Sequence, residues 1–125
     1  MVRQRTILVV EDDADLRRLF RTALTLSGYD VEEAGDGLEA LHKLDQFPPD
    51  LVVLDVMLPQ FSGLVVQQEL AAHMLTRDIP VVIITGSGVD LAHVGAACIL
   101  RKPITPEKLI LTVQSCLASG ARGAV

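Results

Sequence analysis

Residues 51–55 and 79–85 read LVVLD and IPVVIIT, and these two runs decide the fold class. Each is a nearly continuous series of Val, Ile and Leu that ends in a polar side chain, Asp55 in the first run and Thr85 in the second. Such runs are typical of central strands in a parallel sheet that helices cover on both faces. The sequence therefore predicts an α/β protein built around these two strands.

The rest of the chain alternates strand-length runs with longer segments of helical period. Further strands are expected at residues 7–10, 29–34 and 97–100, with apolar residues at i, i+3 and i+4 spacing in the segments between strands. This alternation predicts βαβ units. We therefore expect a flavodoxin-like, doubly wound, five-stranded parallel sheet with strand order 2-1-3-4-5, in which the mostly polar residues 29–34 form an edge strand.

Three helices have a clear start in the sequence, at Asp13, Asp36 and Thr105, which are expected to cap them. The glycine-rich residues 86–95 show little helical pattern, so we expect the fourth helix of such a fold to be short or missing. The expected apolar helix faces are Leu16, Leu19, Phe20, Ala23 and Leu24; Leu38, Leu41 and Leu44; Leu64, Val66, Leu70 and Met74; and Leu109, Val113, Cys116 and Leu117.

Length and composition predict one domain. The chain has 125 residues, 50% of them hydrophobic, and we assign residues 1–118 to the domain and residues 119–125 to a flexible tail or the start of a linker.

Cys98 and Cys116 lie in or beside apolar runs without C-x-x-C spacing, which favours buried thiols in the cytoplasm. No apolar run reaches the length of a membrane span. The formal charge of -5 disfavours nucleic acid or an anionic membrane as a direct partner.

Polar residues follow four of the predicted strands at the point where each strand ends, and these residues are Glu11, Asp12, Asp55, Thr85 and Lys102. In open α/β sheets, ligands bind at the carboxyl ends of the strands. Three carboxylates in one pocket imply a divalent cation, and oxygen ligands on a shallow rim suit Mg²⁺. An amine and a hydroxyl opposite them would clamp a phosphoryl group, which makes Asp55 the expected nucleophile. The simpler alternative is that these residues cap helices or end strands.

The sequence resembles the receiver domain of two-component response regulators over nearly its whole length. The matching motifs are ILVVEDD (7–13), LVVLDVMLP (51–59) with Gly63, VVIITG (81–86) and RKP (101–103). Any one of these motifs is weak evidence. Four of them in the same order make a specific resemblance.

The resemblance implies that Asp55 accepts a phosphoryl group from a phosphohistidine of a sensor histidine kinase or phosphotransfer protein. It implies that Asp12 and Asp55 bind Mg²⁺ with the backbone carbonyl of Met57, while Glu11 contributes through water. Thr85 and Lys102 would hold the phosphoryl oxygens, and the Lys102–Pro103 peptide bond would be cis. Such a domain catalyses only its own phosphorylation and dephosphorylation, and signals through contact with other proteins.

Two departures from the family pattern concern signal output. Ile99 stands where an aromatic residue is common, and Ile104 replaces the usual Phe after the lysine-proline pair. We expect Ile99 to be fixed against the core, so that phosphorylation rearranges residues 86–95 more than the last strand.

Two other functions are alternatives to phosphorylation-dependent signalling. One is a receiver-fold module that acts by constitutive protein contact without phosphorylation. The other is a hydrolase of the haloacid-dehalogenase type, which is disfavoured because Met57 stands where its second Asp would be. The cognate kinase, the output partner, the oligomeric state and any fused output domain are not specified by the sequence.

Overall fold

The computed structural model describes residues 4–59, 62–86 and 98–119. The elements along the chain are β1 (Thr6–Val10), α1 (Ala14–Leu26), β2 (Asp30–Ala34), α2 (Gly37–Gln46), β3 (Leu51–Asp55), α3 (Gly63–Ala72), β4 (Val81–Thr85), β5 (Cys98–Arg101) and α4 (Pro106–Ala118). All strand pairs are parallel and the strand order is β2-β1-β3-β4-β5. The predicted fold class, strand order and edge strand are therefore confirmed.

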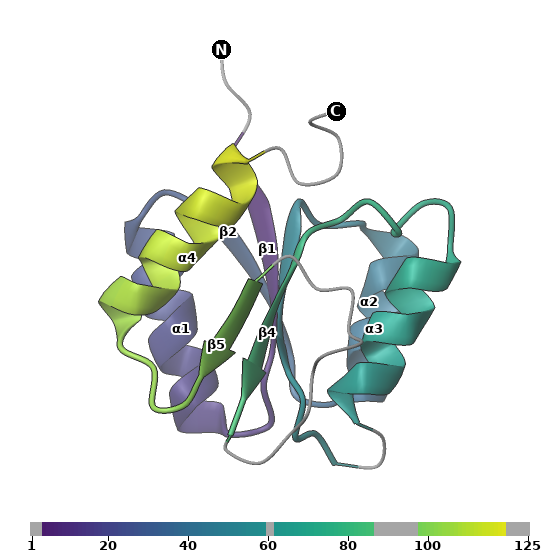
Figure 1. The fold of residues 1–125 in the computed structure, drawn as a ribbon, viewed down its shortest axis with the longest axis horizontal. Helices are drawn as coiled ribbons and strands as arrows, with labels where there is room; N and C mark the ends of the chain where they lie inside the picture. Colours follow the sequence, from purple (N-terminus) through teal and green to yellow (C-terminus); the bar gives the residue numbers. More distant parts are fainter. Residues whose placement is uncertain (1–3, 60–61, 87–97, 120–125) are drawn as a thin grey trace.

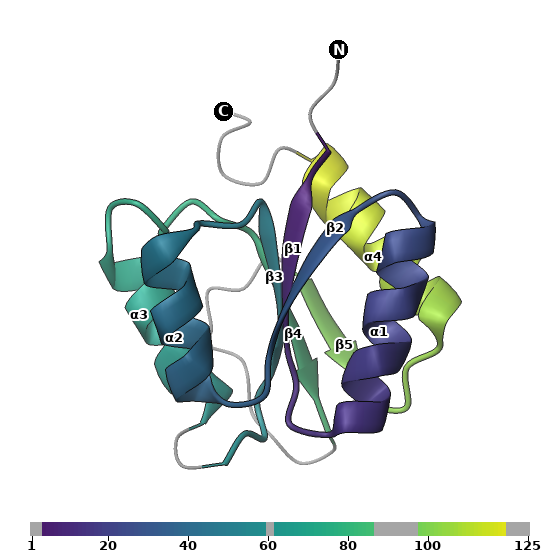
Figure 2. The ribbon, with the colours of Figure 1, turned by 180° about the vertical axis from the view of Figure 1, so that it is seen from behind.

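The helices cover both faces of the sheet. Helices α1 and α4 lie on one face, and α2 and α3 lie on the other (Figures 1 and 2). Consecutive strand residues point to opposite faces, so each central strand supplies both cores. Leu51 and Val53 of β3 pack beneath α1 and α4, while Val52 and Leu54 pack beneath α2 and α3. Burial on both faces explains why the β3 and β4 sequences are apolar without alternation.

The strand register sets the positions of the residues that follow each strand. Val10 of β1 pairs with Leu54 of β3, Asp55 pairs with Ile84 of β4, and Thr85 pairs with Arg101 of β5. The strands therefore end at one edge, where the arrowheads of β4 and β5 lie in Figure 1. The residues after β1, β3 and β5 are consequently neighbours in space.

The predicted helix caps are present. The side chain of Asp13 accepts hydrogen bonds from the backbone N–H groups of the first turn of α1, and Asp36 and Thr105 cap α2 and α4 in the same way. These bonds satisfy backbone donors that have no partner within the helix. Gly28 follows α1 with a φ of 98°, a left-handed conformation that glycine adopts without steric cost.

Four predicted core positions are wrong, because Leu19, Leu38, Met74 and Ile99 are 44%, 61%, 77% and 43% exposed. Leu38 lies in the first turn of α2 and points away from the sheet, where Ala40 and Leu44 are buried instead. Met74 lies beyond the last residue of α3.

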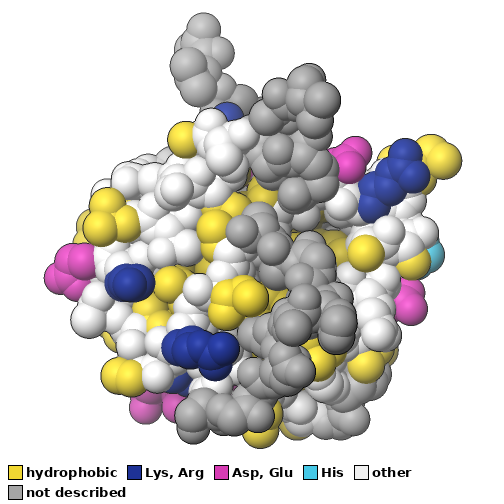
Figure 3. Space-filling model, in the orientation of Figure 1, with side chains coloured by type: hydrophobic (Ala, Val, Ile, Leu, Met, Phe, Trp, Pro, Cys, Tyr) yellow, Lys and Arg dark blue, Asp and Glu magenta, His cyan; other side chains and the backbone are white. Residues whose placement is uncertain are grey.

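Ile99 is exposed because of its position in the sheet. Ile99 lies in β5, the edge strand, and pairs with Ile83 of β4. Both residues lie on the face of the sheet that α2 and α3 cover only nearer its central strands. Leu100 faces α4 and is buried. Figure 3 shows hydrophobic side chains exposed among basic ones on the side of β5 and α4, where Leu111 is also exposed. The expectation that Ile99 is fixed against the core is therefore wrong.

Three other expectations concern the cysteines, the fourth helix and membrane spans. Cys116 is buried as predicted, and Cys98 is only half-buried. A short or missing helix was expected between β4 and β5, ahead of α4. Residues 87–97 of that segment lie outside the described residues, as does most of the expected tail. Among the residues that the structure describes, no helix is long and apolar enough to cross a membrane.

Candidate functional site

Three carboxylates meet at the carboxyl edge of the sheet. Glu11 and Asp12 follow β1 and Asp55 is the last residue of β3, and one oxygen of each lies within 4.8 Å of the others. Glu11 and Asp55 are buried, whereas Asp12 is exposed. The pocket therefore has two acids in its floor and one at its rim.

Both carboxylate oxygens of Asp55 accept a hydrogen bond. Oδ1 accepts from the backbone N–H of Met57 at 2.8 Å, and Oδ2 accepts from the ammonium group of Lys102 at 2.8 Å. Asp55 is fully buried, so these bonds replace the water that would otherwise solvate its charge. The carboxylate is thereby held in one orientation.

Lys102 lies between two acids. Its Nζ atom is 2.8 Å from Oδ2 of Asp55 and 3.7 Å from Oε1 of Glu11. Partial burial lowers the pKa of Lys102, but the hydrogen bond and charge of Asp55 outweigh it and raise the pKa overall. The amine therefore stays charged. Its backbone N–H donates to the carbonyl oxygen of Thr85 at 2.8 Å, and the predicted cis Lys102–Pro103 bond is present.

The environment of Glu11 favours its protonated form. Burial, together with the neighbouring Asp55, raises the pKa of Glu11 to about 8, against the smaller lowering effects of the backbone N–H of Asp13 and the charge of Lys102. Its Oε2 accepts from that N–H at 3.1 Å, whereas its buried Oε1 accepts no hydrogen bond. A buried oxygen without a donor, beside two other carboxylates, fits a hard divalent cation.

The raised pKa of Glu11 predicts a pH dependence of stability without metal. The folded protein favours protonated Glu11. The stabilisation of the fold that protonated Glu11 contributes is therefore complete below pH 4.5 and is lost as the pH rises through about 8. We expect Glu11→Gln to remove this part of the decline. Urea unfolding of both proteins with a chelator, at the two ends of that pH range, measures it. Parallel declines in the two proteins would contradict the prediction.

Thr85 and Met57 lie beside the carboxylates. Thr85 is fully buried at the end of β4, and its hydroxyl donates to the carbonyl oxygen of Gly86 at 3.1 Å. That hydroxyl lies one strand away from Asp55, because β4 pairs with β3. The side chain of Met57 is 63% exposed, and its backbone N–H contacts Asp55. The structure thus groups Glu11, Asp12, Asp55 and Lys102 closely, with Thr85 at the adjacent strand end.

Gly63 supports the pocket in a way that the sequence does not reveal. A Cβ atom on Gly63 would overlap the carbonyl oxygen of Asp55 and lie 3.0 Å from Cα of Val56. The N–H of Gly63 also donates to the carbonyl oxygen of Val56 at 2.9 Å. The start of α3 therefore lies directly against the backbone of the pocket, and only glycine fits there.

This close approach predicts that Gly63→Ala destabilises the fold by about 2 kcal/mol or more, because backbone atoms must move apart. Urea unfolding measures the loss. Gly86→Ala is the matched control, since a Cβ atom there meets no atom within 4 Å. Equal stabilities of the two variants would contradict the proposed crowding.

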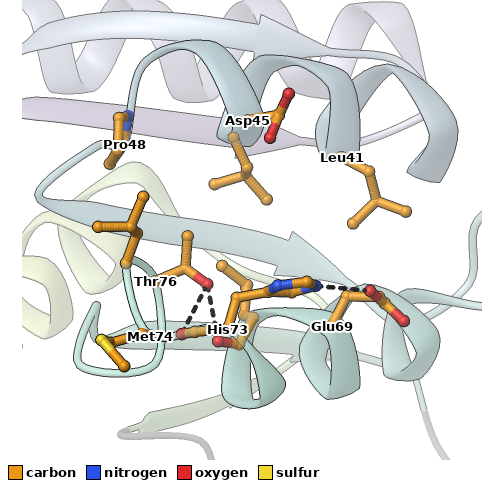
Figure 4. A pocket seen from close by; sticks show the side chains of 10 residues that line it. Leu41, Asp45, Pro48, Glu69, His73, Met74 and Thr76 are labelled. Carbon is orange, nitrogen blue, oxygen red and sulfur yellow. Dashed lines mark hydrogen bonds and ion pairs between the residues drawn. The ribbon is translucent and has the colours of Figure 1, made fainter.

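A separate cavity of about 370 Å³ lies between the C-terminal turns of α2 and α3. Figure 4 shows Leu41, Asp45 and Pro48 on one side of it and Glu69, His73 and Thr76 on the other, with His73 bonded to Glu69. The cavity includes none of the carboxylates described above. We assign it no part in their chemistry.

A doubly wound sheet with an acidic pocket and a lysine at its carboxyl edge defines a class of signalling domain. Residues 7–114 match the model of the response regulator receiver domain, and the chain belongs to this family. The matched receiver domain is a signalling module of two-component systems.

Individual relatives agree with this assignment. The chain is 38% identical to a probable transcriptional regulator, ycf27, of Cyanophora paradoxa, over 93% of this chain and 49% of the relative. It is 36% identical to the phosphate regulon transcriptional regulatory protein PhoB of Escherichia coli strain K12, over 90% of this chain and 52% of PhoB. The chain thus spans about half the length of these relatives.

Solved structures show the same fold. A response regulator structure from Chloroflexus aurantiacus superposes with a TM-score of 0.86 at 31% identity, covering 93% of this chain and 99% of the other. The chemotaxis response regulator CheY4 of Vibrio cholerae gives a TM-score of 0.84 at 28% identity, covering 91% and 99%.

Proposed function

We propose that this chain accepts a phosphoryl group on Asp55 in a Mg²⁺-dependent reaction and signals the modification through protein contact. The observation that carries the proposal is the environment of Asp55. Its carboxylate is fully buried, oriented through both oxygens, and adjacent to a charged amine and two further acids. A buried acid that served only to end a strand would not need this surrounding.

The chemistry is a transfer of the phosphoryl group from nitrogen to oxygen. An oxygen of Asp55 attacks phosphorus, the phosphorus–oxygen bond forms, and the bond to the donor imidazole breaks with its electron pair going to that nitrogen. The ammonium group of Lys102 must then exchange Oδ2 of Asp55 for an oxygen of the incoming group. A move of this kind is short, because the amine already lies between Asp55 and Glu11.

The donor set fits Mg²⁺, which receiver domains bind at an acidic pocket. We propose that Asp12 and Asp55 are direct ligands together with the backbone carbonyl of Met57, and that Glu11 acts through water. When bound, the cation would neutralise charge on the phosphoryl oxygens. The Oε1 atom of Glu11, which accepts no hydrogen bond and lies 3.7 Å from Nζ of Lys102, supports a water ligand on that side.

Thr85 has a proposed role on the opposite side of the pocket. Its hydroxyl is free to exchange the carbonyl oxygen of Gly86 for a phosphoryl oxygen, because both are acceptors for the same proton. Together with Lys102 it would hold the transferred group from the side of β4 and β5.

We further propose that residues 1–118 form the receiver domain and that residues 119–125 are a tail or the start of a linker. The phosphoryl donor would be a sensor histidine kinase or a phosphotransfer protein. The downstream partner would be another protein or a fused output domain. This domain itself would contact neither nucleic acid nor a membrane directly. It would act in the cytoplasm.

The proposal is tested with a small-molecule phosphodonor. The protein is incubated with the donor and Mg²⁺, and its mass is measured with and without a chelator. We expect a mass increase of one phosphoryl group per chain that needs Mg²⁺ and maps to the peptide containing Asp55. No mass increase at any Mg²⁺ concentration would overturn the proposal and favour constitutive, phosphorylation-independent binding to a partner.

A further inference from the structure

We propose that Arg17 of α1 is a positioning residue for the metal pocket, because its guanidinium group fixes the main chain that carries Glu11 and Asp12. The inference rests on the proposed function, since it assumes that these acids bind Mg²⁺. Arg17 makes no contact with Asp55 or Lys102 among the described interactions. Its effect would therefore pass through the backbone of the acidic loop.

The guanidinium group joins two elements of the sheet edge. Its Nη1 atom donates to the carbonyl oxygen of Glu11 at 2.7 Å, and its Nε atom donates to Oε1 of Glu33 in β2 at 3.2 Å. The second oxygen of Glu33 lies 3.2 Å from Nη1 of Arg21, one turn further along α1. Glu33 is therefore held between two arginines, and Arg17 is held between Glu33 and Glu11.

The peptide groups on both sides of Glu11 are consequently tied to β2. The N–H of Glu11 donates to the carbonyl oxygen of Ala34 at 3.0 Å, and the carbonyl oxygen of Glu11 is connected to Glu33 through Arg17. That carbonyl belongs to the peptide bond between Glu11 and Asp12. Its orientation therefore sets the direction from which the Asp12 side chain leaves the backbone.

The local packing restricts the guanidinium group. The side chain of Arg17 is 23% exposed and that of Glu33 is 30% exposed, so this charge pair is largely removed from solvent. A Cβ atom on Gly35 would lie 3.4 Å from Nη1 of Arg17, so the chain after β2 runs close beside the group. A planar group enclosed in this way and bonded at two nitrogens has one orientation, which a flexible ammonium group would not share.

The proposal predicts an effect on metal affinity that exceeds any effect on the fold. Replacing a residue that orients metal ligands typically lowers the affinity for the metal by about tenfold to 100-fold. We expect Arg17→Met, which keeps the apolar stem and removes the donors, to raise the Kd for Mg²⁺ by about tenfold. Arg17→Lys should give an intermediate Kd, because one ammonium group cannot reproduce the two-nitrogen geometry.

The experiment is isothermal titration of each folded protein with Mg²⁺, in parallel with urea unfolding in the absence of metal. Arg18→Met is the matched control, because Arg18 is the next residue of α1 and is exposed. Its Kd should equal that of the wild type. Glu33→Gln keeps Arg17 and weakens its second attachment, so it should raise the Kd in the same direction by a smaller factor. This variant and Arg17→Lys decide the matter if Arg17→Met does not fold.

Two results would overturn the proposal, and they are distinguishable. If the Arg17 and Glu33 variants lose stability but keep the wild-type Kd, the arginine is only structural, and the proposed metal site stands. If the wild-type protein itself does not bind Mg²⁺, the proposed metal site fails and this inference fails with it.

Discussion

Replacing Asp55 with asparagine is expected to abolish phosphorylation by a small-molecule donor and to leave the fold intact. The amide has nearly the same size and shape as the carboxylate, and its oxygen can still accept the hydrogen bond from the N–H of Met57. It lacks the negative oxygen that attacks phosphorus. The labelled fraction, measured by intact mass under conditions that label the wild type completely, should fall to zero.

The control for this substitution is Asp13→Asn. Asp13 is an exposed acid beside the pocket whose side chain caps α1, and asparagine caps helices equally well. This variant should be labelled as fast as the wild type. Labelling of Asp55→Asn at the wild-type rate would show that another residue accepts the phosphoryl group. An unfolded Asp55→Asn protein would be recognised by its circular dichroism.

The second large effect is expected at Asp12. Its exposed carboxylate at the rim of the pocket is the proposed direct ligand, so Asp12→Ala should raise the Kd for Mg²⁺ by roughly 100-fold or more. Glu11→Ala should raise it by only about tenfold, since a ligand that acts through water contributes less. Phosphorylation at a fixed, subsaturating Mg²⁺ concentration should slow in the same order.

The same pair of variants tests the division of roles in a second way. Without metal, and above pH 8 where Glu11 is charged, Asp12→Ala is expected to raise the free energy of unfolding, because it relieves repulsion among three neighbouring carboxylates. Titration calorimetry and urea unfolding measure the two quantities separately. Equal Mg²⁺ affinities in Asp12→Ala and Glu11→Ala would contradict the assignment of one direct and one water-mediated ligand.

The sequence predicted the sheet well because the strands that determine it are buried on both faces. A run such as residues 81–84 has no polar face and fits only a central strand, and the helix caps at Asp13 and Thr105 use local hydrogen bonds that are readable from neighbouring residues. Once the strand order is known, the positions of Glu11 and Asp55 follow from the strand ends. The grouping of these residues was therefore predictable.

The errors arose where burial depends on distant elements. Periodicity places Leu38 on an apolar stripe, but Leu38 lies on the outer side of the first turn of α2, while Gly37 and Ala40 of the same turn are buried. Ile99 has the composition of a core residue, and its exposure depends on which part of the sheet α2 and α3 cover. No pattern within β5 contains that information.

The roles of two supporting residues were missed for a related reason. Gly63 belongs to a motif quoted from the sequence, but the need for glycine becomes visible only when α3 is placed against the carbonyl of Asp55. Arg17 looks like Arg18, an exposed basic residue of an amphipathic helix. Its two partners, Glu11 and Glu33, come from different strands, and only the folded chain brings them to one guanidinium group.

The acidic character of β2 has a consequence for how molecules of this protein behave at high concentration. The outer edge of β2 has no neighbouring strand in the sheet, which is the arrangement that lets two sheets join and aggregate. Its side chains alternate between exposed and partly buried, with Asp30 and Glu32 directed to solvent. A second molecule that approached with its own β2 edge would bring like charges against these two side chains. The strand that is least apolar in the sheet thereby protects the chain from self-association through this edge.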